Sequence, residues 1–388
     1  MERDRISSLP AEVLDSVLTL LPLKQVVQTS ILSKTWRYKW TCLSQFVIDD
    51  KLIPTSIRDI AARWRFIMII LHQIQAHGSV SAIEKFKLSA YCSPDRVDLD
   101  QWVKFLAGKG LKELIFKEST LFNHCDFKLP CSLFSCPQLD HLDLSSCEIN
   151  PPPETHIGFK SLRSLQLNKV STKACILERL IPNCPLLERL TLLHLVFPIF
   201  LRIQNPNLKY LEIHSKFKDL CLADCPSLLS VDISLRRWWW NDAPYHRQSN
   251  LSRVIGHLHT IEKLSLHSSF LQLLGHENVP YRLPSPLHHL TDFQLKDLRL
   301  DSMAQVIMCL CILRSAPNLE KLFLLISHTC STPVEEFLET QYQSSYLNLP
   351  GLKTVKIIAI KGFETESVLT KFIKDRSPIL ERMTVQHY

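Results

Sequence analysis

One arrangement of apolar and polar positions recurs along most of the chain: an apolar residue, two variable positions, and two apolar residues separated by one position. The clearest copies are Leu139–Leu144, Leu162–Leu167, Leu187–Leu192 and Leu319–Leu324. The final apolar-x-apolar step has a period of two, which is typical of a short strand with one buried face. The twelve copies begin at Ile83, Leu111, Leu139, Leu162, Leu187, Leu208, Leu228, Ile261, Leu290, Leu319, Leu352 and Leu380.

So short a strand cannot bury its apolar side alone, but copies stacked in parallel can bury it together. Parallel pairing also requires a return segment between copies, commonly a helix. The repeat therefore predicts an α/β fold in which residues 81–388 form a leucine-rich solenoid with a curved parallel sheet.

Prolines mark where several copies begin. Because proline ends a preceding helix and favours an extended entry into the strand, these positions support the repeat boundaries. We expect the associated cysteines to be packed in the core, since their spacing lacks the second ligand pair of a zinc site, and we predict no metal site. The dipeptides are Cys136-Pro137, Cys184-Pro185, Cys225-Pro226, Ala316-Pro317 and Ser377-Pro378.

Two segments before and between the first copies show helical periodicity. Apolar residues from Ile57 to Ile74 keep i, i+3, i+4 spacing and Gly78 follows them, so we expect residues 46–80 to be a helical connection into the solenoid. Asp100 and Gly108 are placed to begin and end a second helix.

The first 45 residues lack the repeat. One helical face is shared by Val13, Leu14, Val17, Leu18 and Leu21. Pro22 ends that run, and a second amphipathic run begins near Lys24. A helical unit of about 40 residues buries too little apolar surface to be stable alone. The repeat array, a partner chain or both must therefore cover it.

This segment resembles the F-box. The matching motifs, in order, are Ile6-Ser-Ser-Leu9-Pro10-Ala-Glu12-Val13-Leu14, Leu20-Leu21-Pro22-Leu23-Lys24, and Leu32-Ser33-Lys34-x-Trp36-Arg37-x-x-Trp40. The stretch from Phe46 to Asp50 is similar to the start of the repeats in the plant branch of that family, and residues of about 345–388 resemble the FBD motif. The whole order resembles a plant F-box/FBD/leucine-rich repeat protein, with residues 1–45 as the F-box domain.

The resemblance implies a non-catalytic substrate-recognition subunit of a Skp–cullin–F-box ubiquitin ligase. Its F-box would dock on a Skp-type adaptor, and through it on a cullin–RING ligase, while the repeats bind a target protein. The adaptor-binding residues implied by position are Leu9, Pro10, Val13, Leu14, Leu18, Leu21, Pro22, Val26, Val27, Leu32 and Trp36. Which of these contact the adaptor and which pack internally stays open.

Target binding is expected on the residues that alternate with the buried apolar positions of the strands. They mix charges, hydroxyls and aromatics, as protein-recognition surfaces do. Three adjacent tryptophans cannot all face one core from a strand, so an exposed Trp beside Arg is a further candidate. The candidate substrate-binding residues are Tyr210, Glu212, His214, Arg236, Arg237, Trp238, Trp239 and Trp240.

Composition narrows the functional classes. With only 8 glycines in 388 residues, the chain has no glycine-rich phosphate loop and none of the common hydrolase or metalloprotease motifs, so we expect no catalysis and no cofactor. The net charge of +7 is spread out, which argues against nucleic-acid binding. No apolar run approaches the ~20 residues of a membrane span, so we expect a soluble protein of the cytoplasm, the nucleus or both.

Three alternatives remain open from the sequence. The repeats could form a small-molecule-dependent receptor, in which a ligand lies between the target and the repeat surface. The chain could be a repeat scaffold outside any ligase. A hydrolase or transferase would need a catalytic cluster, for which His288 and His289 are the nearest candidates.

Overall fold

The computed structural model describes most of the chain, and the chain forms two compact units. The first unit comprises Met1–Leu187 with His194–Phe197, and the second comprises Glu188–Leu193 with Pro198–Tyr388. The described residues are 6, 9–78, 82–92, 96–117, 127–151, 155–196, 200–217, 219–235, 254, 258–275, 280–328, 337, 340, 347–359 and 364–387.

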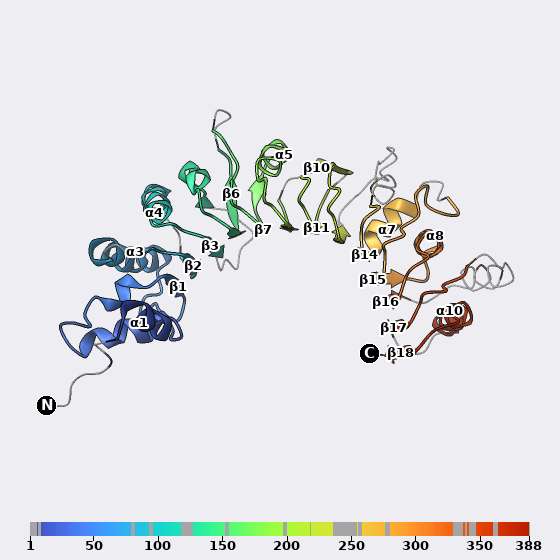
Figure 1. Cartoon of the computed structure of the whole chain (residues 1–388), viewed down its shortest axis with the longest axis horizontal. Helices are drawn as coiled ribbons and strands as arrows, with labels where there is room; N and C mark the ends of the chain where they lie inside the picture. Colours follow the sequence, from blue (N-terminus) through green and yellow to red (C-terminus); the bar gives the residue numbers. More distant parts are fainter. Residues whose placement is uncertain are drawn as a thin grey trace. The chain divides into compact units, whose positions relative to one another are not determined.

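The first unit begins with short helices and continues as a parallel sheet with helices on one side, as Figure 1 shows for α3 and α4. Its helices are α1 (Ala11–Leu18), α2 (Leu23–Gln28), η1 (Thr29–Ile31), η2 (Lys39–Cys42), α3 (Ile60–His77), α4 (Arg96–Gly108), η3 (Cys131–Ser135) and α5 (Ala174–Leu180). Its main sheet has the order β1 (Gln45–Asp49), β2 (Lys85–Ser89), β3 (Glu113–Lys117), β5 (His141–Ser145) and β7 (Ser164–Asn168). A small second sheet pairs β4 (Phe127–Lys128), β6 (Cys147–Ile149) and β8 (Ser171–Thr172).

The second unit repeats the same plan, with α7, α8 and α10 all on one side of its strands (Figure 1). These helices are α7 (Ser268–Gly275), α8 (Met303–Ser315) and α10 (Glu364–Asp375). The main sheet has the order β9 (Arg189–Leu193), β11 (Tyr210–Ser215), β13 (Ser230–Leu235), β14 (Lys263–His267), β15 (Asp292–Arg299), β16 (Lys321–His328), β17 (Thr354–Ala359) and β18 (Arg382–His387). Strands β10 (Phe200–Gln204) and β12 (Asp219–Ala223) form a separate pair.

The strands lie where the repeat predicts them. All twelve copies are followed by a parallel strand that begins two residues after the first apolar position, so the predicted α/β repeat fold is confirmed. The register pairs like with like: Leu142 lies opposite Leu165, and Leu190 opposite Leu211. These four side chains are at most 2% exposed, so the alternate apolar residues form the core. We call the opposite side of each sheet, which carries the intervening residues and none of the helices named above, the open face.

The segment 46–80 begins as a strand. We expected a helical connection there, and α3 does fill most of it, but β1 pairs in register with β2 and is a thirteenth strand beside the twelve predicted ones. Phe46 and Ile48 of β1 are fully buried, because their two-residue spacing turns both toward the core.

The cysteines before the prolines pack as expected. Cys136 and Cys184 are buried and Cys225 is half-buried. Burial raises the pKa of the Cys136 and Cys184 thiols to about 11, so both are neutral at physiological pH. Buried neutral thiols act here as small apolar groups.

Charged side chains of alternating sign stand one residue before many of the strands, at Glu84, Lys112, Asp140, Arg163, Glu188 and Lys209, and again at Glu320, Lys353 and Glu381. The backbone at these positions bonds to its counterpart in the preceding repeat, as for Lys112 N–H and Glu84 O at 2.9 Å. Ion pairs then join neighbouring repeats: Glu84–Lys112 at 2.6 Å, Asp140–Arg163 at 3.4 Å, Glu188–Lys209 at 3.2 Å and Glu320–Lys353 at 2.7 Å. Each surface pair contributes only about 0–1 kcal/mol to stability.

Within the described ranges, no helix combines the length and the apolar character needed to cross a bilayer.

Candidate functional site

Helix α1 presents apolar side chains to two sides. Pro10 precedes it with φ −54°, a value that proline fixes and that suits a helix start. Leu14 and Leu18 face inward and are 6% and 4% exposed. Val13 and Val17, one turn apart on another face, are 44% and 47% exposed. The helix therefore seals a small core with one face and leaves an apolar stripe uncovered on another.

The segment after α1 has the same division. Leu23 and Val26 of α2 are buried, whereas Leu20 before α2 is 83% exposed and Ile31 in η1 is 86% exposed. A large aliphatic side chain this exposed is unfavourable in water unless a partner covers it. We refer to seven exposed aliphatic residues between positions 9 and 32 as the N-terminal apolar patch: Leu9, Val13, Val17, Leu20, Leu21, Ile31 and Leu32.

The structure divides the predicted adaptor-binding residues into three groups. Four are buried inside the helical unit: Leu14, Leu18, Val26 and Trp36. Val27 is half-buried. Six are exposed: Leu9, Pro10, Val13, Leu21, Pro22 and Leu32. Three exposed apolar residues, Val17, Leu20 and Ile31, were not among the predicted ones, although Val17 and Ile31 belong to the apolar runs of the sequence.

Three contacts fix the helical unit on the first strands and α3. The Asp15 carboxylate accepts hydrogen bonds from Ser44 N–H at 2.9 Å and from Ser44 Oγ at 2.6 Å, just before β1. The ring of Tyr38 stacks on His77 at the end of α3, with ring centroids 3.8 Å apart. At Gly78 an added Cβ would lie 2.7 Å from the Thr41 carbonyl oxygen, so glycine permits the close approach of η2.

Replacing Asp15 by Ala is expected to lower the free energy of unfolding by about 2 kcal/mol, because it leaves two donors of Ser44 without their charged acceptor. Urea unfolding followed by tryptophan fluorescence measures this change. Ser16→Ala on the same helix removes only an exposed bond to Glu12 O and should change stability by less than about 0.5 kcal/mol. Equal effects of the two substitutions would contradict the assigned role of Asp15.

The predicted substrate-binding residues of β11 lie together on the open face of the second unit. Tyr210 is 38% exposed, and the Arg189 guanidinium of β9 lies 4.4 Å from its ring centroid. Glu212 accepts a weak bond from Thr191 Oγ1 at 3.4 Å, and His214 Nε2 lies 3.8 Å from the Glu212 carboxylate. Aromatic, acidic and imidazole groups thus share one exposed strand, as the alternation predicts.

Asp232 of β13 links this strand to more distant repeats. Its carboxylate lies 3.1 Å from His214 Nε2 and accepts a 2.7 Å bond from Lys296 of β15. Burial alone would raise the pKa of Asp232, but the bonds from His214 and Lys296 outweigh burial and the pKa is lowered. Burial lowers the pKa of the nearby His267, against the raising influence of Asp297. Charged groups from three strands of this face are therefore paired with one another.

Asp232→Asn should lower stability at pH 7, and the difference from the natural chain should shrink below about pH 4. The sign follows from the lowered pKa: the carboxylate stabilises the fold above its unfolded pKa, and this contribution is lost as pH falls through the folded value. Urea unfolding of both proteins from pH 7 to about pH 3 tests this. A stability gap that does not change with pH would refute it.

Arg236, Arg237, Trp238, Trp239 and Trp240 lie outside the described residues. Among the residues that the structure does describe, no three His, Cys, Asp or Glu side chains gather as a metal site.

Two features bear on the alternative functions. His288 and His289, the candidates for a catalytic cluster, are both exposed. A hollow, which concerns the small-molecule receptor, lies beside α4 and η3 on the helix side of the first unit. Asp100, Lys104, Cys131 and Ser132 line this hollow. The hollow is therefore not on the open face, where a small-molecule receptor of the expected kind would hold its ligand.

A helical N-terminal unit with an exposed apolar patch, followed by parallel leucine-rich repeats with a polar open face, is the architecture of F-box proteins with leucine-rich repeats. Comparison with known families agrees with it. Residues 6–45 match the family model of the F-box domain. Residues 99–324 match the model described as FBD-associated F-box protein At5g56370, LRR repeats.

The chain belongs to the F-box/FBD/LRR-repeat family. It is 34% identical over 392 aligned residues to F-box/FBD/LRR-repeat protein At1g13570 of Arabidopsis thaliana, covering 98% of this chain and 91% of that protein. Two other Arabidopsis thaliana proteins align over shorter stretches. F-box/FBD/LRR-repeat protein At4g00160 is 31% identical over 55% of this chain and 47% of its own length. FBD-associated F-box protein At4g10400 is 30% identical over 59% of this chain and 55% of its own length.

Proposed function

We propose that the chain is the substrate-recognition subunit of a Skp–cullin–F-box ubiquitin ligase. The observation that carries this proposal is the N-terminal apolar patch, which lies in the segment that matches the F-box domain. Its surface contains some of the most exposed large aliphatic side chains of the described chain, including Leu20 and Ile31. A Skp-type adaptor that covers the patch would remove this apolar surface from water.

The adaptor would connect the chain to a cullin–RING ligase, and the repeats would hold a target protein. The chain itself performs no bond chemistry in this proposal. It acts by proximity, because a target held near a ubiquitin-loaded enzyme reacts as if at a high local concentration. This role places the protein in the cytoplasm, the nucleus or both.

The division of the F-box residues adds a structural reason for the proposal. Four residues build a core inside the helical unit: Leu14, Leu18, Val26 and Trp36. This core supports the unit before any adaptor protein binds. Asp15 and Tyr38 attach that unit to the repeats, which limits its movement. A docking surface built on an ordered support loses less conformational entropy on binding.

The direct test is binding of the purified full chain to a recombinant plant Skp-type adaptor, measured by isothermal titration calorimetry. We expect a one-to-one complex with a negative heat-capacity change, the signature of apolar burial. The complex should then assemble with a cullin–RING module on a size-exclusion column. Failure to bind any member of a panel of Skp-type adaptors would overturn the proposal and favour a repeat scaffold outside a ligase.

A further inference from the structure

Three basic side chains lie close together on the open face of the last three strands of the second unit. Lys321 of β16, Lys356 of β17 and Arg382 of β18 are all exposed. The register places Lys321 opposite Thr354, which is opposite Arg382, and places Phe323 opposite Lys356. In the part of the chain that the structure describes, none of these three side chains forms an ion pair.

The lysines and the arginine of β14 and β15 are matched by acids, among them Arg299 by Asp301 at 2.7 Å. Lys263 pairs with Asp292 at 3.6 Å, and Lys296 pairs with Asp232 at 2.7 Å. At the strand entrances, Lys353 pairs with Glu320 at 2.7 Å. The three basic side chains of β16 to β18 therefore differ from those of the neighbouring strands β14 and β15, whose charges are paired.

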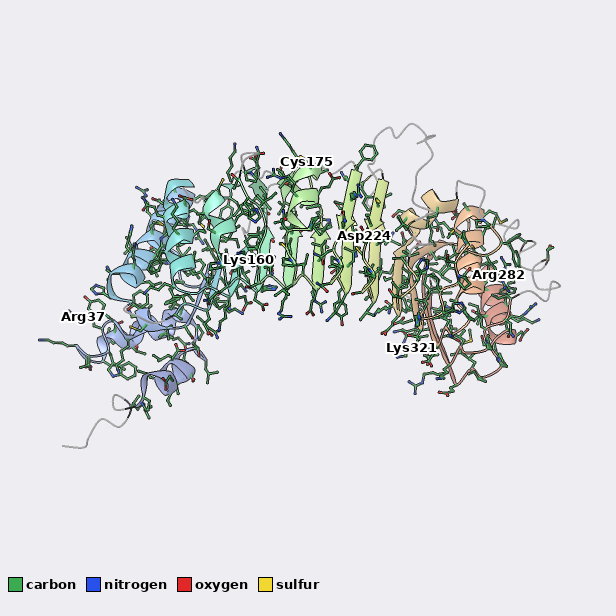
Figure 2. The ribbon with its side chains drawn as sticks, turned by 45° about the horizontal axis from the view of Figure 1, so that its top comes forward. Arg37, Lys160, Cys175, Asp224, Arg282 and Lys321 are labelled. Atoms are coloured by element: carbon green, nitrogen blue, oxygen red, sulfur yellow. The ribbon has the colours of Figure 1, made fainter. Side chains whose placement is uncertain are left out.

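Apolar side chains adjoin these charges on the side toward the C-terminal ends of the strands. Phe323 and Leu325 of β16 and Ile358 of β17 point to the open face and are only half-buried. Leu325 lies opposite Ile358 in the register. Most repeats of this unit carry polar residues at the position of Phe323, such as Glu212, Asp232, Ser265 and Gln294. We call Lys321, Phe323, Leu325, Lys356, Ile358 and Arg382 the cationic–apolar patch, and Figure 2 marks Lys321.

We propose that the cationic–apolar patch binds an acidic segment of a target protein through carboxylates that flank one large apolar side chain. The proposal rests on the proposed function, because it assigns a substrate class to the recognition subunit. Lys356 and Arg382 occupy diagonal positions on neighbouring strands, about 7–8 Å apart between their backbones, so their like charges repel until an anion lies between them. An apolar side chain of the target would cover Phe323, Leu325 and Ile358.

The surroundings favour a peptide over a nucleic acid. A nucleic-acid groove carries positive charge along its length, whereas acids lie directly beside this patch: Asp292 is opposite Lys321 and Glu320 precedes it. The half-buried aliphatic side chains beside the charges suit an apolar anchor better than a phosphate backbone.

The test is selection of peptides from a phage-displayed library of random dodecapeptides on the immobilised full chain, followed by fluorescence anisotropy with the enriched peptides. We expect the selected sequences to be rich in Asp and Glu around a Phe, Leu or Ile. The double substitution Lys356→Glu with Arg382→Glu should weaken their binding about tenfold or more, and added salt should weaken binding to the natural chain. Phe323→Ala should also weaken it, by removing the apolar contact.

A matched control separates a local effect from a change in net charge. Arg282→Glu with Lys374→Glu makes the same charge change at exposed residues of the second unit outside its open face. Leu283, next to Arg282, donates its N–H to Ser315 Oγ at the end of α8, and Lys374 lies in the last turn of α10. It should leave peptide affinity unchanged. The proposal is overturned if no peptide is enriched, if the enriched peptides are no more acidic than the library, or if both double variants bind them equally.

Two further measurements distinguish this proposal from others. A short single-stranded RNA of mixed sequence that binds through Lys356 and Arg382, while no peptide is enriched, would assign the patch to nucleic acid and overturn the proposal. Adaptor binding is measured on the same variants. A variant that loses peptide binding but keeps adaptor binding is altered at the cationic–apolar patch alone. If the natural chain binds no adaptor, the proposed ligase function is rejected.

Discussion

The double substitution Leu20→Asp with Ile31→Asp is expected to abolish binding of a Skp-type adaptor. Both side chains are more than 80% exposed in the free chain, so their replacement should leave the fold intact. Burying each of them against a partner would contribute about 1.5–3 kcal/mol, and two such losses weaken binding at least about 100-fold. Calorimetric titration of the adaptor into the purified variant measures the affinity.

A control for this result lies on the adjoining helix. Ile69 of α3 is 61% exposed but lies outside the N-terminal apolar patch, so Ile69→Asp should leave adaptor affinity unchanged. Leu14→Ala tests the opposite side of α1: because Leu14 is buried, the substitution should lower stability by about 2–4 kcal/mol. Unaltered adaptor affinity after the double substitution would show that another surface binds the adaptor.

Phe293→Ala should be among the most destabilising single substitutions in the second unit. Phe293 of β15 is fully buried between Leu264 and Leu322 in the register of the sheet. Truncating a phenylalanine at such a site leaves a cavity and typically lowers the free energy of unfolding by about 3–5 kcal/mol. Urea unfolding followed by circular dichroism measures the change.

Phe323→Ala on the next strand is the matched comparison, because it removes the same side chain from the open face. Phe323 is only half-buried, so we expect a loss of about 1 kcal/mol. The ratio of the two losses reports which face of the sheet is the core. Similar losses for both substitutions would mean that a second packed layer covers the open face.

The strand positions could be predicted from the sequence because each copy contains its own register signal. The spacing of the apolar residues fixes which side chains turn inward, and a shift by one residue would expose all of them. Strand β1 has the same signal, because Leu43, Phe46 and Ile48 form a further copy of the pattern and the strand begins two residues after Leu43. This copy was not counted because it lies where the F-box resemblance ends and a helical connection was expected.

The apolar residues of α1 were expected to share one face, but that face is wide, and which part of it turns inward could not be predicted. Leu14 with Leu18 and Val13 with Val17 are equally plausible inward pairs from periodicity alone. The bonds between Asp15 and Ser44, 29 residues apart, help to fix which pair turns inward. A single polar contact over that distance leaves no pattern in the sequence.

The pairing of charges on the open face was likewise beyond sequence reasoning. Tyr210, Glu212 and His214 are expected on one face from their alternation, and they are found there. The bond from Lys296 to Asp232 joins residues 64 positions apart, across an intervening strand. It depends on the side-chain conformations of both residues, which the backbone register does not determine.

The alternating charges at the strand entrances constrain how the array can change in length. In the first unit, Glu84, Lys112, Asp140 and Arg163 follow one another in neighbouring repeats. Removing the one repeat that carries Lys112 would bring Glu84 beside Asp140, whereas removing two would bring it beside Arg163. Repulsion between like charges makes the single loss less favourable by up to about 1 kcal/mol. Duplication in evolution, or shortening by protein engineering, should therefore be tolerated better when repeats are added or removed in pairs.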